Sequence, residues 1–262
     1  MKTNRLAGNT LGWSWLVIGM LGAGLSLDLK SQTVSLGTAE NFAVLGATTV
    51  TNTGASVLNG DLGVSPGTAL TGFFAVDGGP GVVNGSIYSA GAEALQAQED
   101  AEDAFDAIAA MAFTTDLTGQ NLGGLTLTPG VYHFDTSAQL TGNLTLDGVG
   151  EYIFQIGSTL TTASNASITG INGADASQFF FNVGSSATLG TGTQFAGTIL
   201  ALTSITLTTG ADIDYGRAIA LNGAVTMDTN FINAVPEPSS ALLVGGALIY
   251  FGMFRSRHSM GS

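Results

Sequence analysis

Two acidic residues are the first candidates for catalysis in this sequence. Asp212 and Asp214 are two positions apart in a run of strand-forming residues, so their carboxylates would project from one face of a strand. Glycosidases use such carboxylate pairs, and Arg217 follows closely in sequence. Between residues 28 and 234 the single histidine is His133, and a lone strand histidine is more often packed or exposed than catalytic. A polysaccharide-cleaving enzyme is therefore a remote alternative, and we expect no enzymatic activity and no cofactor.

A second group of acids, between residues 93 and 106, raises the question of a metal site. The run lacks the Asp-x-Asp-x-Asp-Gly order of a calcium loop, so we interpret it as the solvated face of a helix. The chain has no cysteine, which excludes disulfides and thiolate zinc sites. We expect no metal.

The charge balance limits the possible partners. The net charge is −13, and between residues 28 and 234 the basic residues are Lys30 and Arg217. A body this acidic repels phosphate backbones, so we expect no nucleic-acid binding.

A repeating pattern indicates the elements that carry these side chains. Four apolar runs are each followed by a short run rich in threonine and small residues. Aligning Phe179 with Thr198 and Thr198 with Arg217 gives a step of 19 residues each time, whereas the step from Tyr152 to Phe179 is 27, which indicates an insertion. Such a period is typical of stacked β-units. The sequence predicts a mainly β protein, a β-solenoid. The apolar runs are 152–157, 179–184, 197–202 and 216–221, and the threonine-rich runs are 158–162, 185–189, 203–207 and 222–227.

Residues 90–112 interrupt the strand pattern. Apolar residues recur there every three or four positions, which predicts one long α-helix. Its alanine-rich face is expected to pack closely on the solenoid, because alanine is small. The packing face consists of Ala94, Ala97, Ala101, Ala104, Phe105, Ile108 and Met111.

Both ends carry targeting features. Residues 1–27 have a basic start, an apolar stretch and small residues, which predicts a cleaved signal peptide. A membrane anchor is the alternative. Residues 235–262 resemble the PEP-CTERM sorting signal of Gram-negative bacteria, with an apolar segment at 241–254 that predicts transient membrane association. This resemblance implies processing by an exosortase and a secreted, cell-surface or extracellular-matrix location. Its residues are Pro236, Glu237, Pro238, Arg255 and Arg257.

The intervening domain, residues 28–234, resembles the microbial ice-binding protein family. The motifs that carry the resemblance occur in order at residues 41–46 (NFAVLG), 60–67 (GDLGVSPG), 129–132 (PGVY), 154–157 (FQIG), 183–190 (VGSSATLG) and 197–200 (GTIL). The family implies a right-handed triangular, discontinuous β-solenoid with a long helix alongside. It also implies coils stacked out of sequence order, with the final segment fitted between earlier parts, and a flat face that binds ice.

In some family members the ice-binding face repeats the pattern Thr-Ala/Gly-x-Thr/Asn. Residues 68–71 and 162–165 match this pattern, and residues 53–56, 191–194 and 209–212 match its first half. The resemblance therefore implies ice-binding roles for Thr53, Ser56, Thr68, Thr71, Thr162, Asn165, Thr191, Thr193 and Thr209.

A physical argument supports threonine in this role. Its side chain is stiff and carries a methyl group and a hydroxyl, which together can hold water in an ordered array on a flat surface. We therefore expect a monomer whose partner is the surface of an ice crystal. The competing hypothesis is a structural protein of the extracellular matrix that mediates adhesion without binding ice.

Overall fold

A computed structural model describes residues 33–234. The predicted signal peptide and sorting segment, including the apolar residues 241–254, lie outside the described residues. Within the described part, no helix is both long and apolar enough to cross a membrane.

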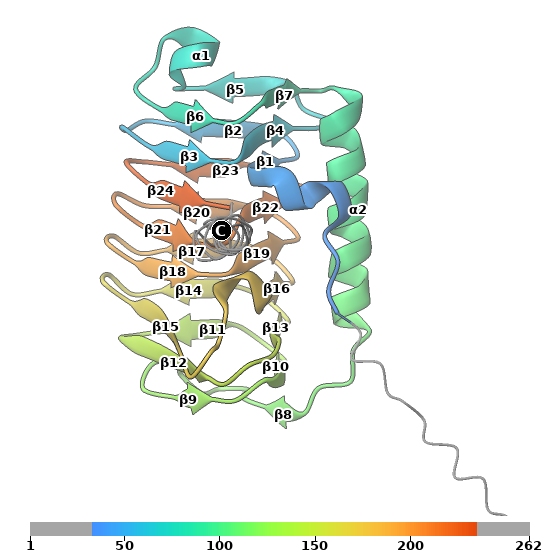
Figure 1. The fold of residues 1–262 in the computed structure, drawn as a ribbon, viewed down its shortest axis with the longest axis vertical. Helices are drawn as coiled ribbons and strands as arrows, with labels where there is room; N and C mark the ends of the chain where they lie inside the picture. The colour runs from blue at the N-terminus through green and yellow to red at the C-terminus, as the bar shows by residue number, and fades with distance from the viewer. Residues whose placement is uncertain (1–32, 235–262) are drawn as a thin grey trace, which may run out of the picture. The chain divides into compact units, whose positions relative to one another are not determined.

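Three parallel sheets form the sides of the solenoid, as the alternation of apolar and small residues predicts (Figure 1). Sheet A has the order β7 (Ile87–Ser89), β4 (Asp61–Val64), β1 (Phe42–Gly46), β22 (Ala218–Ala220), β19 (Thr198–Ala201), β16 (Phe179–Val183), β13 (Tyr152–Ile156), β10 (Gly130–Phe134) and β8 (Thr115–Asp116). Sheet B has the order β11 (Ala138–Leu140), β14 (Leu160–Thr162), β17 (Ala187–Leu189), β20 (Ile205–Leu207), β23 (Val225–Met227), β2 (Thr49–Asn52) and β5 (Ala69–Thr71). Sheet C has the order β6 (Val82–Asn84), β3 (Val57–Asn59), β24 (Phe231–Asn233), β21 (Asp212–Asp214), β18 (Gln194–Ala196), β15 (Ser167–Ile171), β12 (Asn143–Asp147) and β9 (Thr126–Leu127).

The predicted repeat is confirmed, with a small shift in register. Tyr152 pairs with Phe179, 27 residues later, as expected. Thr198, however, lies opposite Phe180 rather than Phe179. The extra residues of the long coil form the loop between β15 and β16, which contains the short helix η2 (Ala176–Gln178).

The coils are not stacked in the order of the sequence. Strands β1, β2 and β3 form a coil from which the chain continues to β4–β7 at one end of the stack. After helix α2 the chain resumes at the opposite end of the stack, and successive coils from β8 onward approach the first coil. The last coil, β22–β24, pairs with β1, β2 and β3. The blue and the orange-red segments therefore meet inside the stack, nearer to the end that carries α1, in Figure 1.

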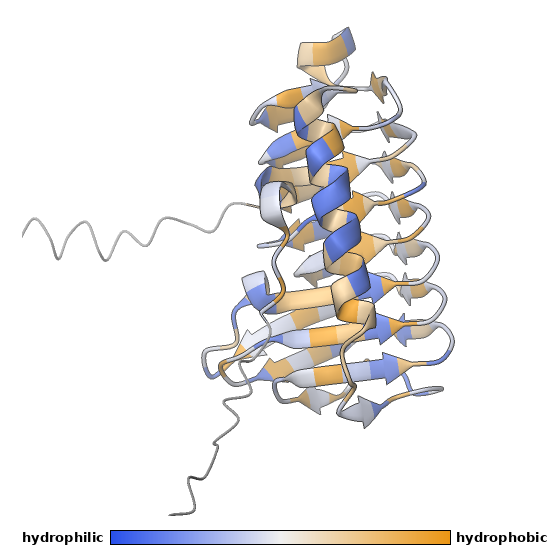
Figure 2. Ribbon diagram, turned by 90° about the vertical axis from the view of Figure 1, so that its right-hand side faces the viewer, coloured by the Kyte–Doolittle hydropathy of each residue, from blue (hydrophilic) through white to orange (hydrophobic). Residues whose placement is uncertain are grey.

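Helix α2 (Ala92–Ala109) connects the two ends of the stack and covers the outer face of sheet A (Figure 1). Its buried alanines pack on large apolar residues of that face, among them Phe180, Leu200 and Ile219. Hydrophilic residues follow its outer face (Figure 2), and its bounds fall within residues 90–112, where the sequence predicts a helix. The other helical segments are η1 (Gly37–Asn41) and α1 (Phe74–Asp77).

The interior is a single apolar core between the three sheets. Aromatic rings pack together inside it: Phe154 and Phe181 of neighbouring coils stack with their centroids 4.5 Å apart, and Phe195 of sheet C lies tilted against Phe181 with a centroid distance of 4.7 Å. Since each coil repeats the same inward positions, the core fixes which side chains must face outward.

Candidate functional site

The outer face of sheet B carries a ladder of threonines. In each three-residue strand the outer two side chains are buried and the middle one points away from the core. The printed pairings place these outward residues directly opposite one another on neighbouring strands. We call this set the threonine ladder; it runs Gln139, Thr161, Thr188, Thr206, Thr226, Thr51 and Thr71.

A second row of small residues lies beside the ladder, two positions before each ladder residue in the sequence. Side-chain contacts connect its neighbours: the hydroxyl of Thr159 donates to Ser137 over 2.8 Å, and the backbone of Ala224 donates to the Ser204 hydroxyl over 3.2 Å. No member of either row is charged. The second row runs Ser137, Thr159, Ser186, Ser204, Ala224, Thr49 and Ala69.

The other two sides of the solenoid lack these properties. Helix α2 covers sheet A. Sheet C carries Asp212 and Asp214 on its outer face, and Phe231 on that face is 41% exposed. Among the described residues, sheet B is therefore the uncovered side with a continuous row of uncharged hydroxyl-bearing side chains.

The residues selected by the tetrapeptide pattern lie elsewhere, with one exception. Thr71 is the last member of the threonine ladder, and Thr68 is exposed in the loop before β5. The other seven lie at the corner between sheets B and C, where the chain turns after each sheet B strand. They are Thr53, Ser56, Thr162, Asn165, Thr191, Thr193 and Thr209.

Three of these corner residues are buried, which corrects the prediction that they contact ice. Ser56 and Thr193 are 0% exposed, and Thr162 is 3% exposed. The hydroxyls of Thr162 and Thr193 lie 2.7 Å apart, and Thr162 also accepts the backbone N–H of Gly190. Their hydroxyls are used to close the turn, so they are not available to an external surface.

The exposed corner residues also serve the turns. Asn165 has a φ of +57°, in the left-handed region that asparagine tolerates better than most residues. The hydroxyl of Thr209 donates to the carboxylate of Asp228 in the next coil. Their tetrapeptides recur because every coil needs this turn.

The residues considered for catalysis are separated from one another. Asp212 and Asp214 do project from the same face of β21, as their spacing predicts. Arg217, however, is buried and donates to the backbone carbonyls of Glu40 and Ala234. His133 lies on β10 in sheet A, with three strands between it and β22.

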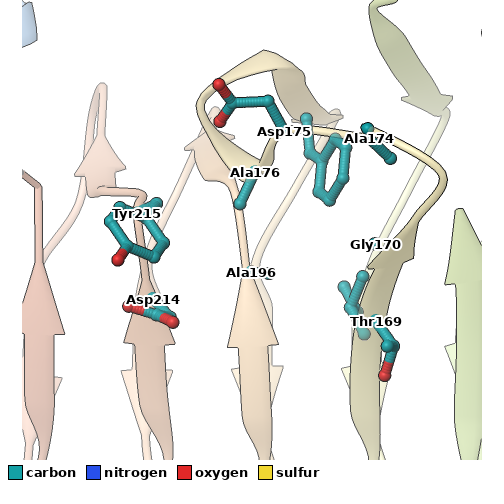
Figure 3. A pocket seen from close by; sticks show the side chains of 11 residues that line it. Thr169, Gly170, Ala174, Asp175, Ala176, Ala196, Asp214 and Tyr215 are labelled. Carbon is teal, nitrogen blue, oxygen red and sulfur yellow. The ribbon is translucent and has the colours of Figure 1, made fainter. Parts of the chain in front are cut away.

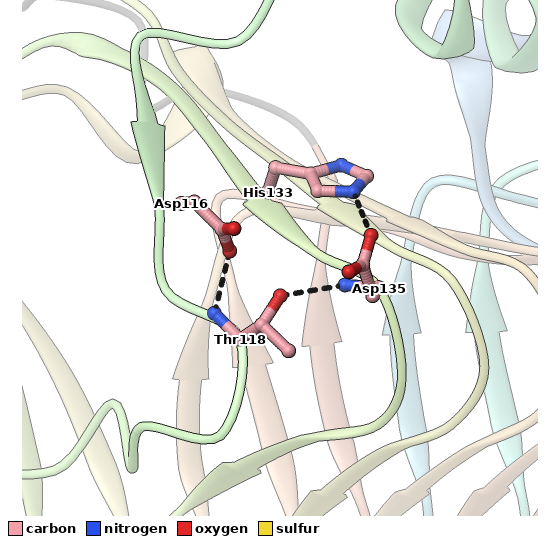
Figure 4. A network of polar contacts seen from close by, with 4 residues as sticks. All are labelled: Asp116, Thr118, His133 and Asp135. Atoms are coloured by element: carbon pink, nitrogen blue, oxygen red, sulfur yellow. Dashed lines mark hydrogen bonds and ion pairs between the residues drawn. The ribbon is translucent and has the colours of Figure 1, made fainter.

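His133 belongs to a small polar network at the far end of the stack (Figure 4). Its Nε2 lies 2.9 Å from Asp135 Oδ1, and the backbone N–H of Asp135 donates to the Thr118 hydroxyl. Hydrogen bonds from Thr118, with a smaller contribution from the charge of His133, lower the pKa of Asp116. These contacts hold the end coil together, and the network contains no pair of facing carboxylates.

The sequence contains a signal that identifies half of the ladder threonines. Thr188, Thr206 and Thr226 occupy the middle of apolar–Thr–apolar triplets in the threonine-rich runs. Strict alternation around a threonine is the signal of an outward position on a half-buried strand. The tetrapeptide pattern drew attention to the turns instead.

Comparison with known proteins adds independent information. The chain is 55% identical to an ice-binding protein of Nostoc sp. (strain HG1), over 89% of this chain and 91% of that protein. An ice-binding protein of Flavobacterium frigoris (strain PS1) is 32% identical, over 82% and 79%. The crystal structure of an ice-binding protein from the Antarctic ascomycete Antarctomyces psychrotrophicus superposes on this chain with a TM-score of 0.72. The alignment covers 78% of this chain and 100% of that one, and the aligned sequences are 39% identical.

The model of the Ice-binding-like family matches residues 44–233, which span the strands from β1 to β24. With this match and these relatives, the chain belongs to the Ice-binding-like family.

Proposed function

We propose that this protein binds ice and that the outer face of sheet B is the surface that contacts the crystal. The observation that carries the proposal is the threonine ladder, which presents one small side chain per strand along the sheet. Its close relatives named ice-binding proteins support the same function.

The regular stacking of strands explains how such a face would act. Paired strands lie about 4.7–4.9 Å apart, so the ladder repeats methyl and hydroxyl groups at that interval along the solenoid axis. The methyl groups restrict the water beside them, and the hydroxyls anchor it by hydrogen bonds. Water held in fixed positions on a rigid face merges with the ordered water of a crystal and slows its growth.

The absence of charge from the two rows favours this mechanism. Charged side chains orient water strongly around themselves and would interrupt an ordered layer. The acids of sheet C and of helix α2 lie on the other sides of the solenoid, where they keep the protein soluble without disturbing sheet B.

A bulky substitution at the centre of the ladder tests the proposal. Thr206 lies on β20, the middle strand of sheet B. We expect Thr206→Tyr to abolish partition of the purified protein into growing ice and to abolish inhibition of ice recrystallisation, with little change in unfolding temperature. The control is Thr126→Tyr, which places the same side chain on β9 of sheet C and should leave both activities unchanged.

Two results would contradict the proposal. One is that the Thr206 variant enters ice as well as the unmodified protein does. The other is that the Thr126 variant loses activity to the same extent, which would place the ice-binding surface on sheet C or show that any surface suffices.

We further propose that the protein is exported as a monomer and sorted to the cell surface or matrix. The sequence features of residues 1–27 and 235–262 support export, exosortase processing and transient membrane association. The mass of the protein recovered from the outside of cells would test cleavage at both ends. We also assign the solenoid a right-handed winding, since connections between parallel strands of one sheet are almost always right-handed.

A further inference from the structure

A groove at a different corner of the solenoid is not explained by ice binding. It has a volume of about 600 Å³ and lies where sheet C turns into sheet A (Figure 3). One wall is the loop between β15 and β16, which includes Asp175 and Ala176, and the opposite wall carries Asp214 and Tyr215. The groove exists because the 27-residue coil has a long loop between β15 and β16, whereas in the next coil a single residue connects β18 to β19.

The backbone of Tyr215 is the most unusual feature of the groove. Its φ is +48°, in the left-handed region that is unfavourable for a bulky side chain. The pairing of Ala196 with Asp214 places Gly197 at the equivalent position of the neighbouring coil, where φ is +103°. Glycine adopts such angles without a steric cost, so the backbone conformation at 215 favours glycine over tyrosine. An aromatic residue at a strained position in a groove points to a role for its side chain.

The lining has the chemistry of a sugar site. Asp175 and Asp214 provide carboxylate oxygens, which accept hydrogen bonds from hydroxyl or ammonium groups, and Thr169 adds a hydroxyl. Tyr215 supplies an aromatic surface, and Ala176 and Ala196 are small enough to leave the space open. The volume lies in the range of small-molecule sites. No basic side chain lines the groove, so acidic sugars would be repelled.

We propose that this groove binds a neutral or amino-substituted sugar residue of a polysaccharide, with Tyr215 and Asp214 as its main contacts. The groove does not involve sheet B, so the protein would hold a glycan at one corner while its ice-binding face stays free. A molecule with both sites would attach ice-active protein to a polysaccharide layer.

Titration calorimetry of the purified full-length protein tests the proposal. The probes are chitobiose, its de-acetylated glucosamine dimer and digalacturonate. We expect the first two to bind with a dissociation constant of about 1 mM or tighter and digalacturonate not to bind. Tyr215→Gly is expected to weaken binding at least tenfold. Asp214→Asn is expected to weaken it about tenfold.

Two control variants test whether any loss of sugar binding is specific to the groove rather than a result of changing a left-handed residue or the net charge. Thr229→Gly changes another left-handed residue, with φ +57°, at the corner between sheets B and C. Asp103→Asn removes one negative charge from helix α2, away from the groove. Both should bind the probes as the unmodified protein does, and all four variants should still partition into ice.

Three outcomes would overturn the proposal. The first is that neither chitobiose nor the glucosamine dimer binds. The second is that the Tyr215 variant binds them with unchanged affinity, and the third is that digalacturonate binds equally well. Because ice partition is measured on the same samples, failure of the sugar site and failure of the ice-binding face are recorded separately.

Discussion

Threonine has two different roles in this protein, and its position within the strand decides which one it takes. Thr161 and Thr162 are neighbours on β14, yet Thr161 is exposed and Thr162 is buried. Successive side chains of a strand point to opposite faces, so a shift of one residue moves a hydroxyl from the ladder to the interior. Once inside, the hydroxyl must be hydrogen-bonded, and Thr162 satisfies this requirement with Thr193 and Gly190.

A substitution that keeps the shape of Thr162 but removes its hydroxyl should destabilise the fold. We expect Thr162→Val to lower the free energy of unfolding by about 1–3 kcal/mol, because the Thr193 hydroxyl and the Gly190 N–H lose a buried partner. Denaturant unfolding measures the change. The adjacent Thr161→Val is the control and should change stability by less than about 0.5 kcal/mol. Equal effects of the two substitutions would refute the assignment of separate roles.

Helix α2 is held on sheet A by polar contacts as well as by its alanines. Near its C-terminal end, the amide of Gln155 donates to the carbonyls of Ile108 and Met111, over 2.7 and 2.8 Å. The amide of Asn182 donates to the carbonyl of Phe105. The last carbonyls of a helix have no partner within the helix, and here side chains of the sheet provide some of those partners.

Removal of the Gln155 amide should weaken this end of the helix. We expect Gln155→Leu to reduce the free energy of unfolding by about 1–3 kcal/mol, since the Met111 carbonyl loses a donor and the Ile108 carbonyl keeps only the N–H of Met111. Amide hydrogen exchange should accelerate in the last turns of α2 before it does in sheet B. Uniform acceleration across the whole chain, or none in the helix, would show that the amide does not anchor this element.

The contact between α2 and the 3-10 helix η1 should depend on pH. The carboxylate of Asp100 accepts the backbone N–H and the hydroxyl of Thr38, over 2.6 and 2.7 Å. These hydrogen bonds, with one from Gln96, lower the pKa of Asp100 below its ordinary value of 3.8. A carboxyl with a lowered pKa stabilises the fold above its unfolded pKa, and this contribution is lost as the pH falls through the folded value.

We therefore expect Asp100→Asn to lower the unfolding temperature at neutral pH and to reduce the loss of stability between about pH 4 and about pH 2. Thermal unfolding followed across this range, compared with Asp103→Asn on the same helix, provides the measurement. If both variants show the same acid profile as the unmodified protein, Asp100 does not link these two elements.

Arg217 joins the two ends of the described chain. Its guanidinium donates to the carbonyl of Glu40 from two nitrogens, over 2.6 and 2.9 Å, and to the carbonyl of Ala234 over 3.2 Å. Glu40 precedes the first strand of the solenoid and Ala234 follows the last, so one side chain closes the place where the first and final coils meet. Burial lowers the pKa of Arg217, but its hydrogen bonds satisfy the charge without a buried carboxylate.

Loss of this side chain should loosen the junction of coils. We expect Arg217→Met to lower the free energy of unfolding by about 1–3 kcal/mol or more, because the carbonyls of Glu40 and Ala234 lose their donor. Arg217→Lys should recover only part of the loss, since an ammonium cannot reproduce the geometry of a guanidinium. Chemical denaturation of both variants decides the point, and full stability of the methionine variant would show that backbone pairing alone closes the stack.

Local patterns in the sequence were enough to predict the kinds of element and much of their extent. Alternating apolar and small residues specified strands, the spacing of 19 and 27 residues located the insertion, and alanines at three- and four-residue intervals identified α2 and its packing face. Each of these patterns depends on neighbours within a few positions, where backbone geometry alone places side chains on one face or the other.

The functional surface required contacts between distant residues. The ladder becomes continuous only because β23 pairs with β2, which places Thr226 beside Thr51 across 175 positions of sequence. Likewise, Arg217 donates to Glu40, which lies far away in the sequence. The groove beside Tyr215 is also formed by segments that are distant in the sequence. No local pattern encodes such pairings, because they depend on which coil stacks on which; the resemblance to a family indicated the stacking, and the register between coils then selected the threonines that face outward.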